Sequence, residues 1–214
     1  MTEQMLETIA GSFPLTELPC GEFEKMTVNG MVFHVRRFIA GGLGNVSVMA
    51  ASAGPMKMDT LVITPTERDM PLLSYDRVLA MGNDTLIFEL YDTLLGTADL
   101  SGLDEVKAAA ADLPDHDLGS HWYDSIKLPQ SLSKQGTKAQ SEAFDSIVSR
   151  YLTQYLAAAR NAPACDAARK REKAGIYTEG LLTHGGPSTD IFKKGIGEEK
   201  AAELFRRVLF AAEV

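Results

Sequence analysis

Asp76 is the residue of this chain whose setting most favours acid–base chemistry. It lies within residues 72–81, a run that reads as a β-strand, and successive side chains of a strand point to opposite faces. One face of this strand then carries Asp76 together with Leu72, Ser74, Val78 and Ala80. A carboxyl on an apolar face costs several kcal/mol unless it is partnered, and it tends to keep its proton. Either this face is a core or pocket that uses the acid, or Asp76 faces solvent while Arg77 extends along the other side.

The strand that carries Asp76 belongs to a predicted antiparallel sheet over residues 22–92. Asn29-Gly30 is a strong hairpin signal between strand-like runs at residues 22–28 and 31–39. Further short runs follow at residues 45–51, 57–64, 72–81 and 85–91, with a turn at 82–84. Connections this short join only antiparallel neighbours, so we expect a meander of about six strands.

Residues 103–214 read as mainly helical. Apolar residues recur at steps of three and four from Phe144 to Leu156, which predicts one buried stripe on a long helix. Further helices are predicted at residues 2–10, 103–113, 166–182 and 198–212, with a loop region around 114–136. Strands followed by helices indicate an α+β fold in a single domain over residues 1–214. In it, one antiparallel sheet is flanked by helices as an α/β/α sandwich.

The composition fits one enzyme-sized domain. With 214 residues, 45% of them hydrophobic and 23% charged, the chain can bury a full core without disulfides or metals. The net charge of -8 argues against non-specific binding to nucleic acid. No apolar run reaches membrane-spanning length, and the N-terminus has no basic, signal-like segment. We therefore expect a cytoplasmic protein without membrane association.

Other groups that could do chemistry give weak signals. Cys20 and Cys165 show no disulfide, zinc or iron–sulfur pattern, and the four histidines lack metal-ligand spacing. Gly41-Gly42-Leu43-Gly44 is followed by a strand, whereas a dinucleotide fingerprint needs a helix there. His121-Trp122-Tyr123-Asp124 is an aromatic cluster on a predicted loop. For this cluster, a Trp that caps the core is favoured over a catalytic role.

Three segments around Asp76 share a recognisable pattern. They are Thr60-Leu61-Val62-Ile63-Thr64-Pro65, Asp69-Met70-Pro71 leading into Asp76, and Leu86-Ile87-Phe88-Glu89-Leu90-Tyr91-Asp92. Together they resemble the central block of the ferredoxin-dependent bilin reductases. In that family, a strand ending in Phe-Pro and a loop ending in Asp-Leu-Pro precede the strand with the catalytic aspartate. Weaker similarities lie in residues 120–126, 151–155 and 197–210, so the resemblance covers most of residues 45–210.

The resemblance implies an oxidoreductase of phycobilin biosynthesis that reduces biliverdin or a related bilin between the sheet and the C-terminal helices. Reduced ferredoxin supplies electrons one at a time in a radical mechanism, without a metal or a tightly bound cofactor, and Asp76 supplies a proton. The sequence holds no cysteine cluster, flavin motif or nucleotide motif that could store electrons, which agrees with an outside donor. The implied enzyme is a monomer. Its substrate contacts are Thr60, Leu73, Ser74, Tyr75 and Val48.

Two basic patches are candidate docking sites for ferredoxin. The first is formed by Arg169, Lys170, Arg171 and Lys173, at the start of a predicted helix. The second is formed by Lys193, Lys194, Arg206 and Arg207. Because ferredoxins are generally acidic and this chain is also acidic overall, docking has to rely on a local patch of this kind. A run of charges is equally typical of a solvated helix face.

Two departures from the family bear on which bond is reduced. The phycocyanobilin-forming branch has a Glu and a His at positions that correspond here to Val48 or Met49 and to Thr60. Neither position can supply an acid. The family's Asn-Asp pair before the penultimate helix corresponds to Gly185-Gly186, which leaves His184 or Asp190 as the substitute acid. An Asp just inside a helix start is also a common partner of the helix dipole.

Three functions therefore stay open from the sequence. The first is a ferredoxin-dependent bilin reductase that uses Asp76. The second is a reductase of another linear tetrapyrrole, such as a chlorophyll or haem catabolite, as in the distantly similar red chlorophyll catabolite reductases. The third is a bilin-binding protein that kept the pocket and lost the chemistry. Retention of Asp76 favours the first two, and Gly185-Gly186 favours the third.

Overall fold

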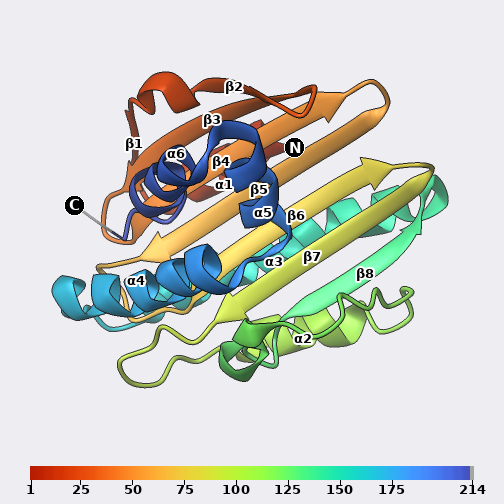
Figure 1. The fold of residues 1–214 in the computed structure, drawn as a ribbon. Helices are drawn as coiled ribbons and strands as arrows, with labels where there is room; N and C mark the ends of the chain where they lie inside the picture. The colour runs from red at the N-terminus through yellow and green to blue at the C-terminus, as the bar shows by residue number, and fades with distance from the viewer. Residues whose placement is uncertain (213–214) are drawn as a thin grey trace.

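Eight strands form one antiparallel sheet in the computed structural model, which describes residues 1–212 (Figure 1). Their order across the sheet is β1-β3-β4-β5-β6-β7-β8, and β2 pairs with the other end of β3. The strands are β1 Leu15–Leu18, β2 Lys25–Val28, β3 Met31–Ala40, β4 Gly44–Ala53, β5 Met56–Pro65, β6 Leu72–Ala80, β7 Asn83–Tyr91 and β8 Leu132–Thr137. The meander predicted from the sequence is confirmed for β2 to β7, whereas β1 and β8 are additional edge strands.

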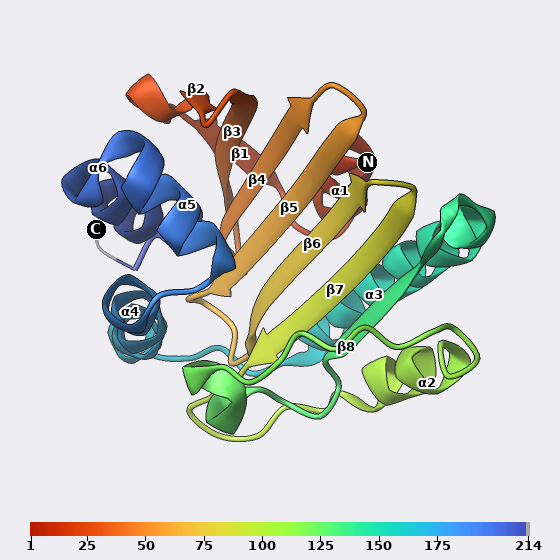
Figure 2. The same ribbon diagram turned by 45° about the vertical axis from the view of Figure 1, so that its right-hand side comes forward.

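Two groups of helices cover the two faces of the sheet (Figure 2). One face carries α1 Thr2–Ala10, α2 Ser101–Ala109 and α3 Ser141–Asn161. The other carries α4 Ala167–His184, α5 Pro187–Ile196 and α6 Glu198–Glu203, and α6 continues into a π-helical turn over Leu204–Leu209. The predicted α+β sandwich is confirmed. Within the part of the chain described, none of these helices has the length and apolar character required to cross a membrane.

The hairpin turns set the register that places Asp76. Asn29 (φ 51°) and Gly30 (φ 79°) both adopt left-handed backbone between β2 and β3, as a two-residue hairpin turn requires. Met81 (φ 52°) and Gly82 (φ 83°) do the same between β6 and β7. This second turn lies one residue before the predicted one, so Asn83 and Asp84 already belong to β7. The strands that flank Asp76 are therefore paired without a slip.

The face under α1, α2 and α3 is a closed hydrophobic layer. Phe88 of β7 stacks on Tyr151 of α3, with ring centroids 4.1 Å apart, and lies 4.8 Å from the ring of Tyr75. Arg77 is also buried on this face, where its guanidinium binds both carboxylate oxygens of Asp84 at 2.7 and 2.8 Å. The sequence reading in which Arg77 extends along a solvated surface is therefore wrong. This layer anchors the sheet and leaves the opposite face free to form a site.

Candidate active site

A cavity of about 340 Å³ lies between the sheet and the second group of helices. Its floor comes from β4, β5, β6 and β7, and its opposite wall from α4, α5 and the C-terminal π-helical turn. The polar and aromatic groups of the floor are Thr60, Ser74, Asp76, Glu89 and Tyr91. The cavity falls within the size range of small-molecule sites. A smaller apolar hollow of about 170 Å³ adjoins it and shares Met56, Met58, Ser188 and Ile191.

Strand alternation explains which residues reach the cavity. Asp76 faces Thr60 across the β5–β6 ladder and Ile87 across the β6–β7 ladder, while Ser74 faces Glu89. Directly paired residues of an antiparallel sheet point to the same face. Four neighbouring strands therefore direct alternate side chains into one space, and the two acids lie on adjacent strands.

Asp76 is half-buried and has one hydrogen-bond donor, the Thr60 hydroxyl, with 2.5 Å between Oγ1 and Oδ1. Burial raises the pKa of the Asp76 carboxyl from 3.8 to about 7. The Thr60 hydrogen bond lowers this pKa, and the nearby charge of Glu89 raises it. The carboxyl is thus protonated in a large fraction of molecules at neutral pH, which is the condition for a general acid.

Glu89 is a second acid in the cavity, and sequence reasoning missed it. The Tyr91 hydroxyl donates to Glu89 Oε2 at 2.5 Å, and Lys127 Nζ lies 3.4 Å from Oε1. The Glu89 side chain is only 12% exposed. Its signal was present in the sequence, because residues 87, 89 and 91 of a strand must share a face. That face is the one that carries Asp76.

Aromatic rings form one wall of the cavity. Tyr91 stacks on Tyr177 of α4 at 4.1 Å between centroids, and Tyr123 stacks on His121 at 4.8 Å with nearly parallel rings. Burial raises the pKa values of Tyr91 and Tyr177 well above 10, so these phenols stay neutral. Flat aromatic faces of this kind suit a planar conjugated ligand.

Trp122 has the anchoring role that its sequence context favoured. Its indole Nε1 donates to the carbonyl of Gly185 at 3.1 Å. Its ring lies against Gly180 so closely that a Cβ at this position would be 2.1 Å from the ring. Trp122 therefore fastens the 3₁₀ turn Trp122–Ile126 to α4, which holds its neighbours His121 and Tyr123 at the cavity.

Three of the five predicted substrate contacts lie on the wrong face. Thr60 and Ser74 line the cavity, as does Met49, one of the two positions considered for the family's Glu. The side chains of Val48, Leu73 and Tyr75 are buried in the opposite layer, under α1 and α3. They alternate with the cavity residues along their strands, so they cannot contact a ligand next to Asp76.

The structure does not bring His184 or Asp190 to the cavity. Both side chains are exposed. The His184 ring lies 5.5 Å from that of Trp122, and Asp190 stands in the first turn of α5, close to Gly185. Gly186, which precedes α5, and Ser188 and Thr189 in the first turn of α5 line the cavity instead. Of the three acids proposed from the sequence, Asp76 alone lies in the cavity.

Lys170 was predicted from the sequence to belong to a docking surface, but the structure buries it, so it is a structural residue. It is fully buried, and its ammonium donates to the carbonyls of Met70 and Thr93 at 2.6 and 2.7 Å and lies 3.4 Å from Asp69. A helical repeat of 3.6 residues turns Lys170 inward while it leaves Arg169 exposed and Arg171 partly exposed. The first basic patch is therefore reduced to Arg169, Arg171 and Lys173, and Lys173 also donates to the carbonyl of Leu94.

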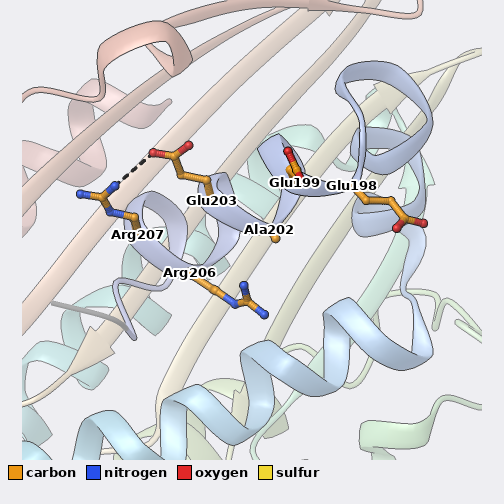
Figure 3. A pocket seen from close by; sticks show the side chains of 6 residues that line it. All are labelled: Glu198, Glu199, Ala202, Glu203, Arg206 and Arg207. Carbon is orange, nitrogen blue, oxygen red and sulfur yellow. Dashed lines mark hydrogen bonds and ion pairs between the residues drawn. The ribbon is translucent and has the colours of Figure 1, made fainter.

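The second basic patch is partly neutralised by acids. Figure 3 shows the surface pocket over α6, where Arg207 pairs with Glu203 at 3.2 Å. Arg206 binds both carboxylate oxygens of Glu179 on α4, at 2.5 and 2.7 Å. Glu198 and Glu199 also line this pocket. An acidic partner meets less positive charge here than the sequence alone indicated.

Comparison with known proteins shows a similarity of fold and no similarity of sequence to a known family. No protein-family model matches the sequence, and no curated protein matches it. Among solved structures, the chain is similar to a crystal structure of phytochromobilin synthase from tomato in complex with biliverdin. The TM-score is 0.77 at 15% identity, over 99% of this chain and 82% of that chain. This chain therefore has the fold of a phytochromobilin synthase, with Asp76 in a cavity on one face of its sheet.

Proposed function

We propose that this protein reduces an open-chain tetrapyrrole, biliverdin or a related bilin, and that Asp76 protonates it. The observation that carries the proposal is a carboxyl with a pKa of about 7 inside an aromatic cavity. Its fold is similar to that of a phytochromobilin synthase in complex with biliverdin. A conjugated tetrapyrrole matches the flat aromatic walls, and a poised acid matches a reduction that consumes protons.

The reaction requires two electrons and two protons for each double bond reduced. In our proposal two molecules of reduced ferredoxin give one electron each and are oxidised. The first electron produces a bilin radical, and the proton of Asp76 forms a new bond to that radical. The second electron and a second proton, which comes from water, complete the dihydrobilin. Asp76 is then reprotonated from water.

The charges of the cavity indicate how a bilin would lie in it. Among the described residues that line it there is no Lys or Arg, while Asp76 and Glu89 both offer oxygen atoms. Carboxylate groups of a bilin would be repelled by Glu89, and pyrrole N–H groups would be attracted by both acids. We therefore propose that the N–H groups face β6 and β7, with the carboxylates toward solvent.

The electron donor would dock at the start of α4. Arg169 and Arg171 remain at the surface there, and Lys173 follows one turn after Arg169. Tyr177 on the same helix lines the cavity. An acidic ferredoxin on this surface would thus contact the helix that separates it from the substrate.

The test is anaerobic incubation of the purified protein with biliverdin, ferredoxin and a reducing system. The expected result is a change in the biliverdin absorption spectrum and a reduced bilin on chromatography, both dependent on ferredoxin. Replacing ferredoxin with buffer is the control for direct chemical reduction. Binding of biliverdin without turnover would contradict the proposed reductase.

A bilin-binding protein without reductase activity is the second candidate. The observation in its favour is that His184 and Asp190 are exposed, which leaves a second proton donor unassigned. Spectral titration with biliverdin would then show stoichiometric binding with no product. If biliverdin neither binds nor reacts, the same assay with open-chain chlorophyll or haem catabolites tests the remaining candidate, a reductase of another linear tetrapyrrole.

A further inference from the structure

Asp76 and Glu89 form a pair of acids on adjacent strands of the cavity floor. Ser74 is the direct partner of Glu89, so Asp76 and Glu89 are diagonal neighbours on one face of the β6–β7 ladder. Diagonal positions of this kind have Cβ atoms roughly 7 Å apart, within reach of a charge–charge interaction at low dielectric. Two carboxyls at this distance resist being ionised together.

Their surroundings decide which of the two carries the charge. Glu89 accepts a hydrogen bond from the Tyr91 hydroxyl at 2.5 Å and lies beside the ammonium of Lys127 at 3.4 Å. Asp76 has one neutral donor, Thr60. A nearby cation favours the ionised form of a carboxyl more than a neutral hydroxyl does. Of the two acids, Glu89 is therefore the one that has a cation beside it.

The other titratable groups described around the pair are three tyrosines, His121 and Lys127. The phenols of Tyr91, Tyr123 and Tyr177 have pKa values raised by burial, so they stay uncharged near neutral pH. His121 also lines the cavity, where its ring stacks on that of Tyr123 and its Nδ1 is buried without a hydrogen-bond partner. Lys127 is the cation nearest to Glu89 among the described residues, and its other partner is Asp124 at 2.9 Å.

We propose that Glu89 is a positioning residue for the reaction, a fixed anion that keeps the proton on Asp76. This role rests on the proposed function only where turnover is concerned, because the charge arrangement is formed by the protein's own residues. Burial is the larger reason that Asp76 holds a proton, and the negative charge on Glu89 adds to it. Pairs of carboxyls in opposite protonation states are how enzymes assign separate roles to similar groups.

The decisive measurement is the titration of Asp76 in the ligand-free protein by NMR of aspartate 13Cγ, assigned with Asp76→Asn. In Glu89→Gln the Asp76 midpoint is expected to fall by about one pH unit, since a neighbouring charge is removed while shape is kept. In Lys127→Gln it is expected to rise, because the offsetting cation is lost. Glu179→Gln, which removes an ion-paired glutamate from α4 outside the cavity, is the control and should leave the midpoint unchanged.

An unchanged Asp76 midpoint in folded Glu89→Gln, or a rise, overturns the inference. If Glu89→Gln fails to fold, the Asp76 midpoint in Lys127→Gln decides between the two roles. A purely structural role for Glu89 and Lys127 predicts no rise of this midpoint. Since no bilin is present, this result is independent of the proposed function. With turnover established, the pH above which the rate falls should move down in Glu89→Gln and up in Lys127→Gln.

Discussion

Thr60 and Asp76 are directly paired across the β5–β6 ladder, and the Thr60 hydroxyl donates to the Asp76 carboxyl at 2.5 Å. The hydroxyl stabilises the ionised carboxyl, against the larger effect of burial. It also fixes the carboxyl orientation on the cavity floor. This pair therefore tunes the acid in addition to holding it.

Replacing Thr60 with Val should raise the pKa of Asp76 above about 7, because the ionised form loses its hydrogen bond. An increase of up to about one pH unit is expected for one neutral hydrogen bond. The alkaline limb of the pH–rate profile for biliverdin reduction should move up by the same amount. Thr60→Ser keeps the hydroxyl and is the control, with a profile close to that of the wild type.

Asp76→Asn should fold and bind biliverdin, since it keeps the shape and a hydrogen-bonding head group. The proton-coupled step should slow by roughly 100-fold to 10,000-fold. Under reducing conditions we expect a bilin radical to accumulate, detectable by electron paramagnetic resonance. Wild-type turnover in this variant would remove Asp76 from the mechanism.

The raised pKa of Asp76 also makes folding stability depend on pH. An unfolded Asp loses its proton at about pH 4, whereas folded Asp76 holds it to about pH 7, so unfolding releases a proton between these values. The wild type should lose up to about 4 kcal/mol of stability as pH rises through this window. Asp76→Asn should lack this loss. Urea unfolding of both proteins between pH 5 and pH 8.5 measures it, and parallel pH dependences would contradict the prediction.

Ferredoxin docking at the start of α4 predicts a salt-sensitive rate. Raising the ionic strength from 0.1 M to 1 M shortens the Debye length from about 10 Å to about 3 Å, so turnover under limiting ferredoxin should fall. The double reversal Arg169→Glu with Arg171→Glu should raise the KM for ferredoxin and leave biliverdin binding unchanged. Arg150→Glu, at an exposed position of α3 on the opposite face of the sheet, is the control. If Arg150→Glu raises the KM for ferredoxin as much as the double reversal does, ferredoxin does not dock at the start of α4.

Lys170→Met should destabilise the fold without changing ferredoxin dependence. The substitution leaves the carbonyls of Met70 and Thr93 without their donor, and Asp69 loses its ammonium partner. A loss of about 2 to 4 kcal/mol is expected for an interrupted buried network of this kind. Urea unfolding measures the loss. Lys173→Met, which removes a partly exposed lysine of the same helix, should cost less.

The sequence predicted the strands that local patterns define and missed those that depend on distant partners. Asn29-Gly30 has its own turn chemistry, so β2 and β3 were placed within a few residues. β8, Leu132–Thr137, has no such signal and lay in a predicted loop. Its strand conformation depends on pairing with β7, which is distant in the chain.

Site prediction was limited by contacts that no short segment encodes. Asp76 was found because an acid inside a strand is a local anomaly. Tyr177 and Lys127 come from other parts of the chain, and only folding brings Tyr177 to the cavity and Lys127 to Glu89. Leu73 and Tyr75 were expected from the family resemblance to contact substrate, and strand alternation, which places them opposite Asp76, was not applied to them. Glu89 was missed for the same reason, since alternation was not carried over to β7.

Along each central strand, residues with even numbers and residues with odd numbers point to opposite faces of the sheet. A substitution on one face changes the cavity, and a substitution on the other changes the closed hydrophobic layer. On β6 the even-numbered residues Ser74 and Asp76 face the cavity, and the odd-numbered Leu73, Tyr75 and Arg77 lie in the closed layer. Engineering of ligand preference can therefore be restricted to one parity on each central strand while the opposite layer is left untouched. A library built in this way would explore new substrates on a scaffold whose folding is protected, because the changed and unchanged side chains never share a face.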